Sequence, residues 1–114
     1  ISPIVLEESK EEYFDLNQES PFMLLIAKVK KKNIPAVTHI DGTGRVQTIK
    51  IDQNEKLYSL IKNFESITGV PVILNTSFND NGEPIVETPL DAIKSFKRTN
   101  LDALFIHNYL IYKQ

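Results

Sequence analysis

The sequence of 114 residues contains no cysteine and no tryptophan, and only one methionine. Without cysteine, the chain cannot form a disulfide, a thiolate metal site or a cysteine nucleophile. No apolar run approaches the roughly 18 residues of a membrane span, and the N-terminus shows no signal-peptide pattern. The net charge is −2 with acidic and basic residues interspersed, which gives no overall nucleic-acid footprint. We therefore expect a cytoplasmic protein that does not bind a membrane.

The hydrophobic content of 41% is typical of a globular protein, and the length suits one domain with its own core. We therefore predict a single domain over residues 1–114. The chain begins at Ile1 rather than methionine, and its first residues already have a strand pattern.

The stretch from Val70 to Asn79 is the most informative one. An apolar run, predicted to be a buried strand over Val70 to Leu74, ends in a cluster of small polar side chains. In open α/β sheets, ligands bind beyond the carboxyl ends of strands. These amides and hydroxyls could hold an oxyanion or a planar carbonyl group without adding charge. The alternative is that they build a turn. The polar residues are Asn75, Thr76, Ser77 and Asn79.

A second candidate region is the loop from Thr38 to Gln47, which contains two glycines followed by Arg45. Gly42 and Gly44 permit positive φ and close backbone approach. Arg45 is placed at the start of a strand predicted over Val46 to Ile51. There its planar guanidinium group could bind a phosphate or carboxylate through two parallel hydrogen bonds. The alternative is a hairpin turn whose arginine is simply solvated.

Together these two stretches resemble one family. The segments "IPAVTHIDGTGRVQT" and "GVPVILNTSFNDNGEPIVETPLDAI" are similar to the C-terminal, YrdC-like domain of NodU/CmcH-type O-carbamoyltransferases. The resemblance covers nearly the whole chain. It implies that a long N-terminal portion is missing, so we expect this chain to be a domain excised from a longer one. It also implies an enzyme that forms carbamoyl adenylate from carbamoyl phosphate and ATP with Mg²⁺. The carbamoyl group then passes to a hydroxyl of an acceptor in a separate N-terminal domain, which is also where the resemblance places the family's iron.

The resemblance also implies roles for particular residues. Arg45 falls at a phosphate-binding position, and Ser77-Phe78-Asn79 matches the Ser-x-Asn motif of YrdC-like domains. In an extended segment Ser77 and Asn79 would share one side, as on a ligand platform, although an exposed polar sheet face gives the same pattern. We take Arg45, Ser77 and Asn79 as catalytic candidates. The substrate-binding candidates are Asn75, Thr76, His39, Asp41 and Thr43.

His39 and Asp41 could also bind a metal or move a proton. Two ligands are too few for a metal site, so we interpret them as loop-ordering or nucleotide-proximal groups and predict no metal site. The lysines at 28, 30, 31 and 32 are interpreted as a solvated turn rather than a phosphate or RNA patch.

The remaining pattern mixes strands with about three helices, so we predict an α/β (α+β) fold with a twisted mixed sheet flanked by helices. Strands are expected over Ser2 to Leu6 and, as a central strand, Phe22 to Val29. A short helix capped by Ser9 is expected to run to Phe14. A closing strand pair is expected over Leu101 to Ile106 and Tyr109 to Tyr112, with His107 in the turn.

Two longer helices carry clear start signals. Asn54 is predicted to cap a helix over Glu55 to Thr68 that stops at Gly69. Thr88 is predicted to cap a second one with Pro89 in its first turn. The expected core residues are Leu57, Leu60, Ile61, Phe64 and Ile67 in the first helix and Leu90, Ile93 and Phe96 in the second.

Two other functions remain open. One is a carbamoyl-adenylate enzyme that acts on tRNA or a maturation protein, although the lack of a basic face argues against tRNA. The other is a non-catalytic nucleotide-binding or interaction module. Strands left unpaired by excision could also let the chain form a homodimer.

Overall fold

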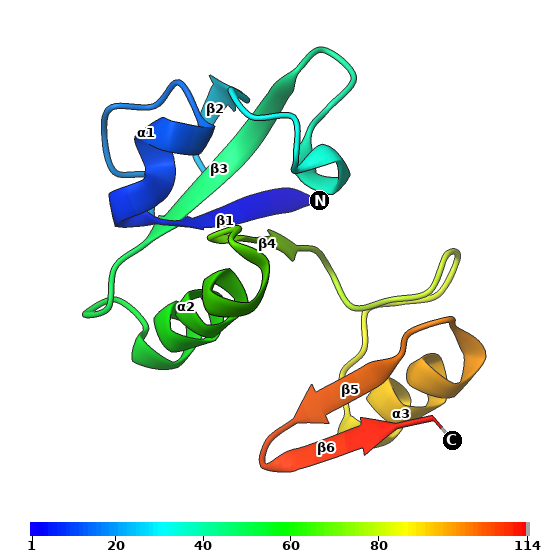
Figure 1. Cartoon of the computed structure of the whole chain (residues 1–114). Helices are drawn as coiled ribbons and strands as arrows, with labels where there is room; N and C mark the ends of the chain where they lie inside the picture. The colour runs from blue at the N-terminus through cyan, green and yellow to red at the C-terminus, as the bar shows by residue number, and fades with distance from the viewer. Residues whose placement is uncertain (114) are drawn as a thin grey trace. The chain divides into compact units, whose positions relative to one another are not determined.

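The computed structural model describes residues 1–113, which form two compact units. The first unit comprises Ile1–Thr76, and the second begins at Ser77. The two units are described separately below, so the prediction of a single domain over residues 1–114 stays a prediction. Four strands in a mixed sheet, a separate two-stranded sheet and three α-helices confirm the predicted α+β class (Figure 1).

The sheet of the first unit has the strand order β2-β3-β1-β4. Its strands are β1 (Ser2–Leu6), β2 (Leu25–Lys28), β3 (Thr43–Ile49) and β4 (Val72–Asn75). β1 runs parallel to β3, and the other pairs are antiparallel. All five residues of β1 are buried, as the centre of a sheet covered on both faces requires.

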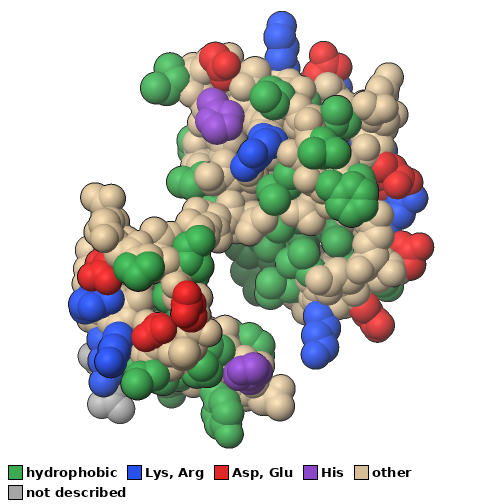
Figure 2. Space-filling view, turned by 180° about the vertical axis from the view of Figure 1, so that it is seen from behind, with side chains coloured by type: hydrophobic (Ala, Val, Ile, Leu, Met, Phe, Trp, Pro, Cys, Tyr) green, Lys and Arg blue, Asp and Glu red, His purple; other side chains and the backbone are tan. Residues whose placement is uncertain are grey.

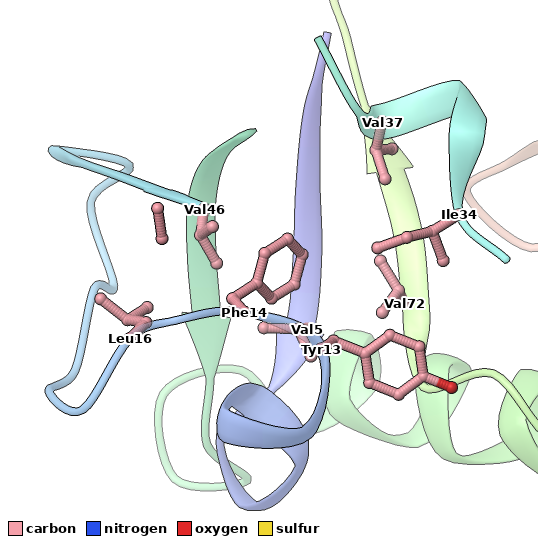
Figure 3. Close-up of a cluster of buried hydrophobic side chains, with 9 residues drawn as sticks. Val5, Tyr13, Phe14, Leu16, Ile34, Val37, Val46 and Val72 are labelled. Atoms are coloured by element: carbon pink, nitrogen blue, oxygen red, sulfur yellow. The ribbon is translucent and has the colours of Figure 1, made fainter. Parts of the chain in front are cut away.

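One face of this sheet packs against the segment around helix α1 (Lys10–Tyr13) and the 3₁₀ helix η2 (Pro35–Val37). Figure 3 shows the Tyr13 and Phe14 rings beside Val5 of β1. Ser9 is at the N-cap of α1 as predicted, but its side chain makes no capping hydrogen bond. A 3₁₀ helix, η1 (Glu7–Ser9), precedes α1 and already starts the turn.

The other face of the sheet is covered by helix α2 (Glu55–Thr68). Its predicted ends are confirmed: the Asn54 side chain accepts a hydrogen bond from the Leu57 N–H, and Gly69 has φ +77°. Ile61 is fully buried against Ile4, Leu6 and Ile49 of the sheet, with Leu57 packed at the edge.

The prediction for the core face of α2 included residues that are not buried. Leu60, Phe64 and Ile67 are exposed, Ile67 by 85%. The sheet offers α2 only a narrow contact centred on Ile61, so apolar spacing overstated how much of the helix is buried.

The prediction of a central strand over Phe22 to Val29 was wrong. Only Leu25–Lys28 forms β2, and β2 lies at the edge of the sheet. Phe22, Leu24 and Ile26 are 70–80% exposed. An apolar run indicates a strand, but strand position depends on which partners pair with it.

The last strand of the first unit, β4, also differs from its prediction. It starts at Val72, includes Asn75, and lies at the other edge of the sheet. Val72 is buried in the core, whereas Leu74 is 42% exposed. An edge strand leaves room for one exposed apolar side chain, which a buried central strand would not.

The second unit contains helix α3 (Pro89–Arg98) and the hairpin β5 (Ala103–Ile106) and β6 (Tyr109–Tyr112). The Thr88 hydroxyl accepts a hydrogen bond from the Asp91 N–H at 3.1 Å, which confirms the predicted cap. Phe96 and Leu104 form the buried core. The prediction that Leu90 belongs to this core was wrong, since it is 59% exposed and the smaller Ala92 is buried instead.

Candidate functional site

The turn that leads into β3 is built from the glycine-containing motif. The Gly42 N–H donates to the His39 carbonyl at 2.9 Å, and the His39 N–H donates to the Thr43 carbonyl at 2.8 Å. Gly42 has φ +81°, a conformation that glycine adopts without strain. The next glycine, Gly44, lies within β3, where a Cβ would come within 3.3 Å of the Val37 carbonyl. The two glycines therefore serve different purposes: one allows the turn, and the other allows close packing.

Asp41 and Thr43 bind each other. The Asp41 carboxylate accepts hydrogen bonds from the Thr43 hydroxyl at 2.6 Å and from the Thr43 backbone N–H at 3.1 Å. These bonds, the hydroxyl bond first, lower the pKa of Asp41 because they favour its ionised form. Both residues order the turn in this structure, and His39 beside them is exposed.

Arg45 lies inside β3 rather than before it, because the strand starts at Thr43. Val46 packs into the core with α1, so its neighbour Arg45 points to the opposite face of the sheet, the face that carries α2. The Arg45 side chain is exposed there.

Register places three further residues in one row with Arg45. Ile26 pairs directly with Arg45, and Ser2 pairs with Asn75. The parallel register of Ile4 with Gln47, continued back by two residues along both strands, brings Ser2 beside Arg45. Paired residues project to the same face of a sheet. Ile26, Arg45, Ser2 and Asn75 therefore form a cross-strand row, which we call the arginine row.

Asn75 has a partner within the first unit. Its Nδ2 donates to the thioether sulfur of Met23 at 3.6 Å. Between Asn75 and Arg45, Ser2 is only 2% exposed. Neither Met23 nor Ser2 was predicted from the sequence as a site residue. Strand register brings Ser2 to this row, and the turn before β2 brings Met23 to it.

Residues Ser77, Phe78 and Asn79 alternate as expected for an extended segment. The Ser77 hydroxyl donates to Asn79 Oδ1 at 2.6 Å, and Phe78 packs toward the core of the second unit. Asn79 Nδ2 also donates to the carbonyls of Asp80 at 3.4 Å and Glu83 at 3.3 Å. The polar pair shares one side, and in this structure it also builds the turn that follows.

The structure thus groups the candidates into three sets. Arg45 and Asn75 share the arginine row, the turn before β3 holds its own three candidates, and Ser77 and Asn79 belong to the second unit. Thr76 is exposed at the end of the first unit.

The distribution of charge and of possible metal ligands gives further information on these sets. Acidic and basic side chains are interspersed on the face drawn in Figure 2, and hydrophobic side chains reach the surface of both units. Within residues 1–113, no three histidine or acidic side chains come together as a metal site. None of the helices in this part of the chain is long and apolar enough to cross a membrane.

Comparison with known proteins shows which proteins this chain is similar to. Nodulation protein NolNO of Sinorhizobium fredii is 46% identical over 99% of this chain and 18% of its own length. Nodulation protein NolO of Bradyrhizobium diazoefficiens is 39% identical over 99% of this chain and 22% of its own. A 3'-hydroxymethylcephem-O-carbamoyltransferase of Amycolatopsis lactamdurans is 35% identical over 82% of this chain and 18% of its own.

The chain therefore spans about a fifth of the length of the curated relatives it matches. The model of the family described as "Carbamoyltransferase C-terminus" matches residues 1–113. This match covers the arginine row, the turn before β3 and the Ser77–Asn79 pair. The expected relationship is confirmed: the chain belongs to the carbamoyltransferase C-terminus family.

Proposed function

We propose that the chain is the C-terminal part of an ATP-dependent O-carbamoyltransferase, which binds carbamoyl phosphate and ATP and forms carbamoyl adenylate. The carbamoyl group would then pass to a hydroxyl of an acceptor bound by an N-terminal domain. The observation that carries the proposal is the family match over residues 1–113. A relative named as an O-carbamoyltransferase supports the same reaction class.

Arg45 is the residue proposed to bind the phosphate of carbamoyl phosphate. It is an exposed arginine on a regular strand, so its position is fixed by the ladder of β3 while its guanidinium is free to meet a ligand. A guanidinium donates two parallel hydrogen bonds to phosphate oxygens. Asn75 in the same row can add an amide donor without adding charge.

Ser77 and Asn79 belong to the second unit, and we propose them as a ligand-binding pair of that unit by itself. Their side chains share one side of the chain and present a hydroxyl and an amide close together. Such groups can hydrogen-bond a planar carbonyl-amide group and the charge that develops on it. In this role the hydrogen bond between Ser77 and Asn79 fixes both side chains before the ligand arrives.

The overall chemistry balances with one water molecule. Water would convert carbamoyl phosphate to carbamate and phosphate. A carbamate oxygen would then bond to the α-phosphorus of ATP as the bond from that phosphorus to pyrophosphate breaks. This chain's contribution is to bind and orient the groups, because phosphoryl and acyl transfers gain mostly from positioning and charge stabilisation. No residue of the proposed site needs to form a covalent intermediate.

ATP fits the exposed cation of the arginine row, since its phosphates need the same type of donor as carbamoyl phosphate. Mg²⁺ in nucleotide sites is held largely by the phosphates themselves and by one or two carboxylates. We propose that the metal comes with ATP. We also propose a cytoplasmic location, where ATP and carbamoyl phosphate are available.

The test is a titration of the chain with carbamoyl phosphate, followed by backbone NMR signals. We expect saturable shifts at Arg45 and its row, and Arg45→Ala should weaken binding by about 1.5–3 kcal/mol, as for a hydrogen bond to a charged group. Arg98→Ala is the matched control, because Arg98 is the second of two arginines, is exposed, and pairs only loosely with Glu83 at 4.0 Å.

Equal affinities of the Arg45→Ala and wild-type chains would remove Arg45 from the phosphate site. An equal loss in Arg98→Ala would indicate general charge attraction instead of a site. If the wild-type chain shows no shift at millimolar carbamoyl phosphate, the proposed ligand assignment fails for this chain.

A further inference from the structure

The segment of residues 21–24 lies outside the ladder of the sheet, in the turn before β2. Just before it, the Ser20 N–H donates to the Thr48 hydroxyl at 2.9 Å, and the Ser20 hydroxyl donates to the Val46 carbonyl at 2.8 Å. Just after it, Leu25 pairs with Val46. Both ends of the segment are thus held beside almost the same residues of β3, so the four residues between them must bulge out of the sheet.

Within this bulge, Met23 has a different environment from its neighbours. Phe22 and Leu24 are 76% and 80% exposed, whereas Met23 is half-buried. Its φ is +58°, a left-handed conformation that is strained for a residue with a long side chain. The strain accompanies a side chain that turns back onto the sheet.

The contact that Met23 makes lies in the arginine row. Its sulfur accepts the Nδ2–H of Asn75 at 3.6 Å, and Asn75 pairs with Ser2, the neighbour of Arg45. Ser2 is almost completely covered although its neighbour Arg45 is exposed. The Met23 side chain therefore holds one of the two N–H groups of the Asn75 amide, which lies in the same row as Arg45.

We infer that Met23 is a displaceable cover of the arginine row, which releases its N–H group of Asn75 when Asn75 binds the phosphate with that group. The inference rests on the proposed function, because it assumes an anion at Arg45. A thioether is a weak acceptor, whereas an ionised phosphate oxygen is a strong one. Binding would exchange the N–H···S contact for an N–H···O bond.

The first test uses the single methionine of the chain as a probe. With the Met23 methyl group labelled with ¹³C, the chain gives one methyl signal of known assignment. We expect titration with inorganic phosphate, and then with carbamoyl phosphate, to shift this signal along the same saturation curve as the Arg45 amide and the Asn75 side-chain amide.

The second test removes the cover. Met23→Gly accepts the positive φ without strain and has no side chain to bind Asn75. If the covered state reduces the fraction of chains competent to bind, this variant should bind phosphate about threefold or more tightly than wild type. Phe22→Gly is the matched control, since it removes an exposed side chain from the same bulge and should leave the affinity unchanged.

The outcomes of these tests distinguish the proposal that Met23 covers the row from the proposal that Arg45 binds phosphate. Shifts at Arg45 with a fixed Met23 methyl signal and an unchanged affinity in Met23→Gly would overturn the cover and leave the phosphate site standing. Binding by Met23→Gly alone would support the cover. If neither chain binds phosphate or carbamoyl phosphate, the proposed ligand assignment falls, and the cover falls with it.

Discussion

The Asp41 carboxylate and its two bonds from Thr43 show what single residues contribute to the turn before β3. The pKa of Asp41 is lower in the folded chain than in the unfolded one. The stabilisation it gives is therefore present above the unfolded pKa and is lost as the pH falls through the folded pKa. Asp41 is exposed, so this effect concerns local order more than global stability.

The Thr43→Val substitution tests this coupling. Valine keeps the strand preference and the backbone N–H but lacks the hydroxyl, so we expect the pKa of Asp41 to rise toward its ordinary value. The measurement is a pH titration of the Asp41 carboxyl carbon by NMR. Thr43→Ser, which keeps a hydroxyl, is the control and should keep the lowered pKa. An unchanged pKa in Thr43→Val would mean that the backbone bond alone accounts for the shift.

At this same scale, the sequence identified most of the polar candidates but not their partners. Arg45 was expected at a strand mouth and lies inside a strand, because β3 starts three residues earlier than the apolar pattern suggested. Ser2 and Met23 carry no motif of their own. Strand pairing places Ser2 in the arginine row, and a left-handed residue in a bulge brings Met23 there.

In helix α2, too, some features could be predicted from the sequence and others depend on the tertiary structure. Its start at Asn54 and its stop at Gly69 depend on neighbouring residues, so the sequence predicted both. Which of its apolar residues are buried depends on the sheet beneath it. Ile61 is fully buried and Ile67 is 85% exposed, although both fit the same helical spacing.

These two isoleucines give a matched pair of substitutions. We expect Ile61→Ala to lower the free energy of unfolding of the first unit by about 2–5 kcal/mol, through lost burial and the cavity it leaves. Ile67→Ala should change it by no more than about 0.5 kcal/mol, as for an exposed site. Urea denaturation followed by NMR signals from β1 measures both. Similar losses in the two variants would mean that Ile67 is covered in solution.

On the scale of the whole molecule, the hydrophobic cores follow the division into two units. Two buried clusters belong entirely to residues of the first unit, and the third belongs entirely to the second. A unit that holds its complete core and its own sheet has the main requirements for folding alone.

We therefore expect the fragment 1–76 to keep the fold of the first unit. Its backbone NMR signals should overlay those of the same residues in the full chain, apart from signals near the new C-terminus. The same fragment with Ile61→Ala serves as a control, because it should lose signal dispersion if the core is what holds the fragment together. A collapsed, poorly dispersed spectrum of the unmodified fragment would show that residues beyond Thr76 are needed for folding.

The sequence by itself determined the features that depend on near neighbours. These are both ends of α2, the capped start of α3, the hairpin of β5 and β6, and the two motifs that relate the chain to carbamoyltransferases. The predicted fold class followed from the mixture of these elements. Caps and turns form within a few residues, so their signals can be read along the chain.

The tertiary structure decided the rest, because strand order and register join residues that are far apart in the sequence. Edge positions for β2 and β4 replaced the predicted central and buried strands. The parallel pairing of β1 with β3 set Ser2 beside Arg45, and the antiparallel pairing of β1 with β4 added Asn75. A shift by one residue in either register would turn these side chains to the opposite face, so only the folded sheet creates the arginine row.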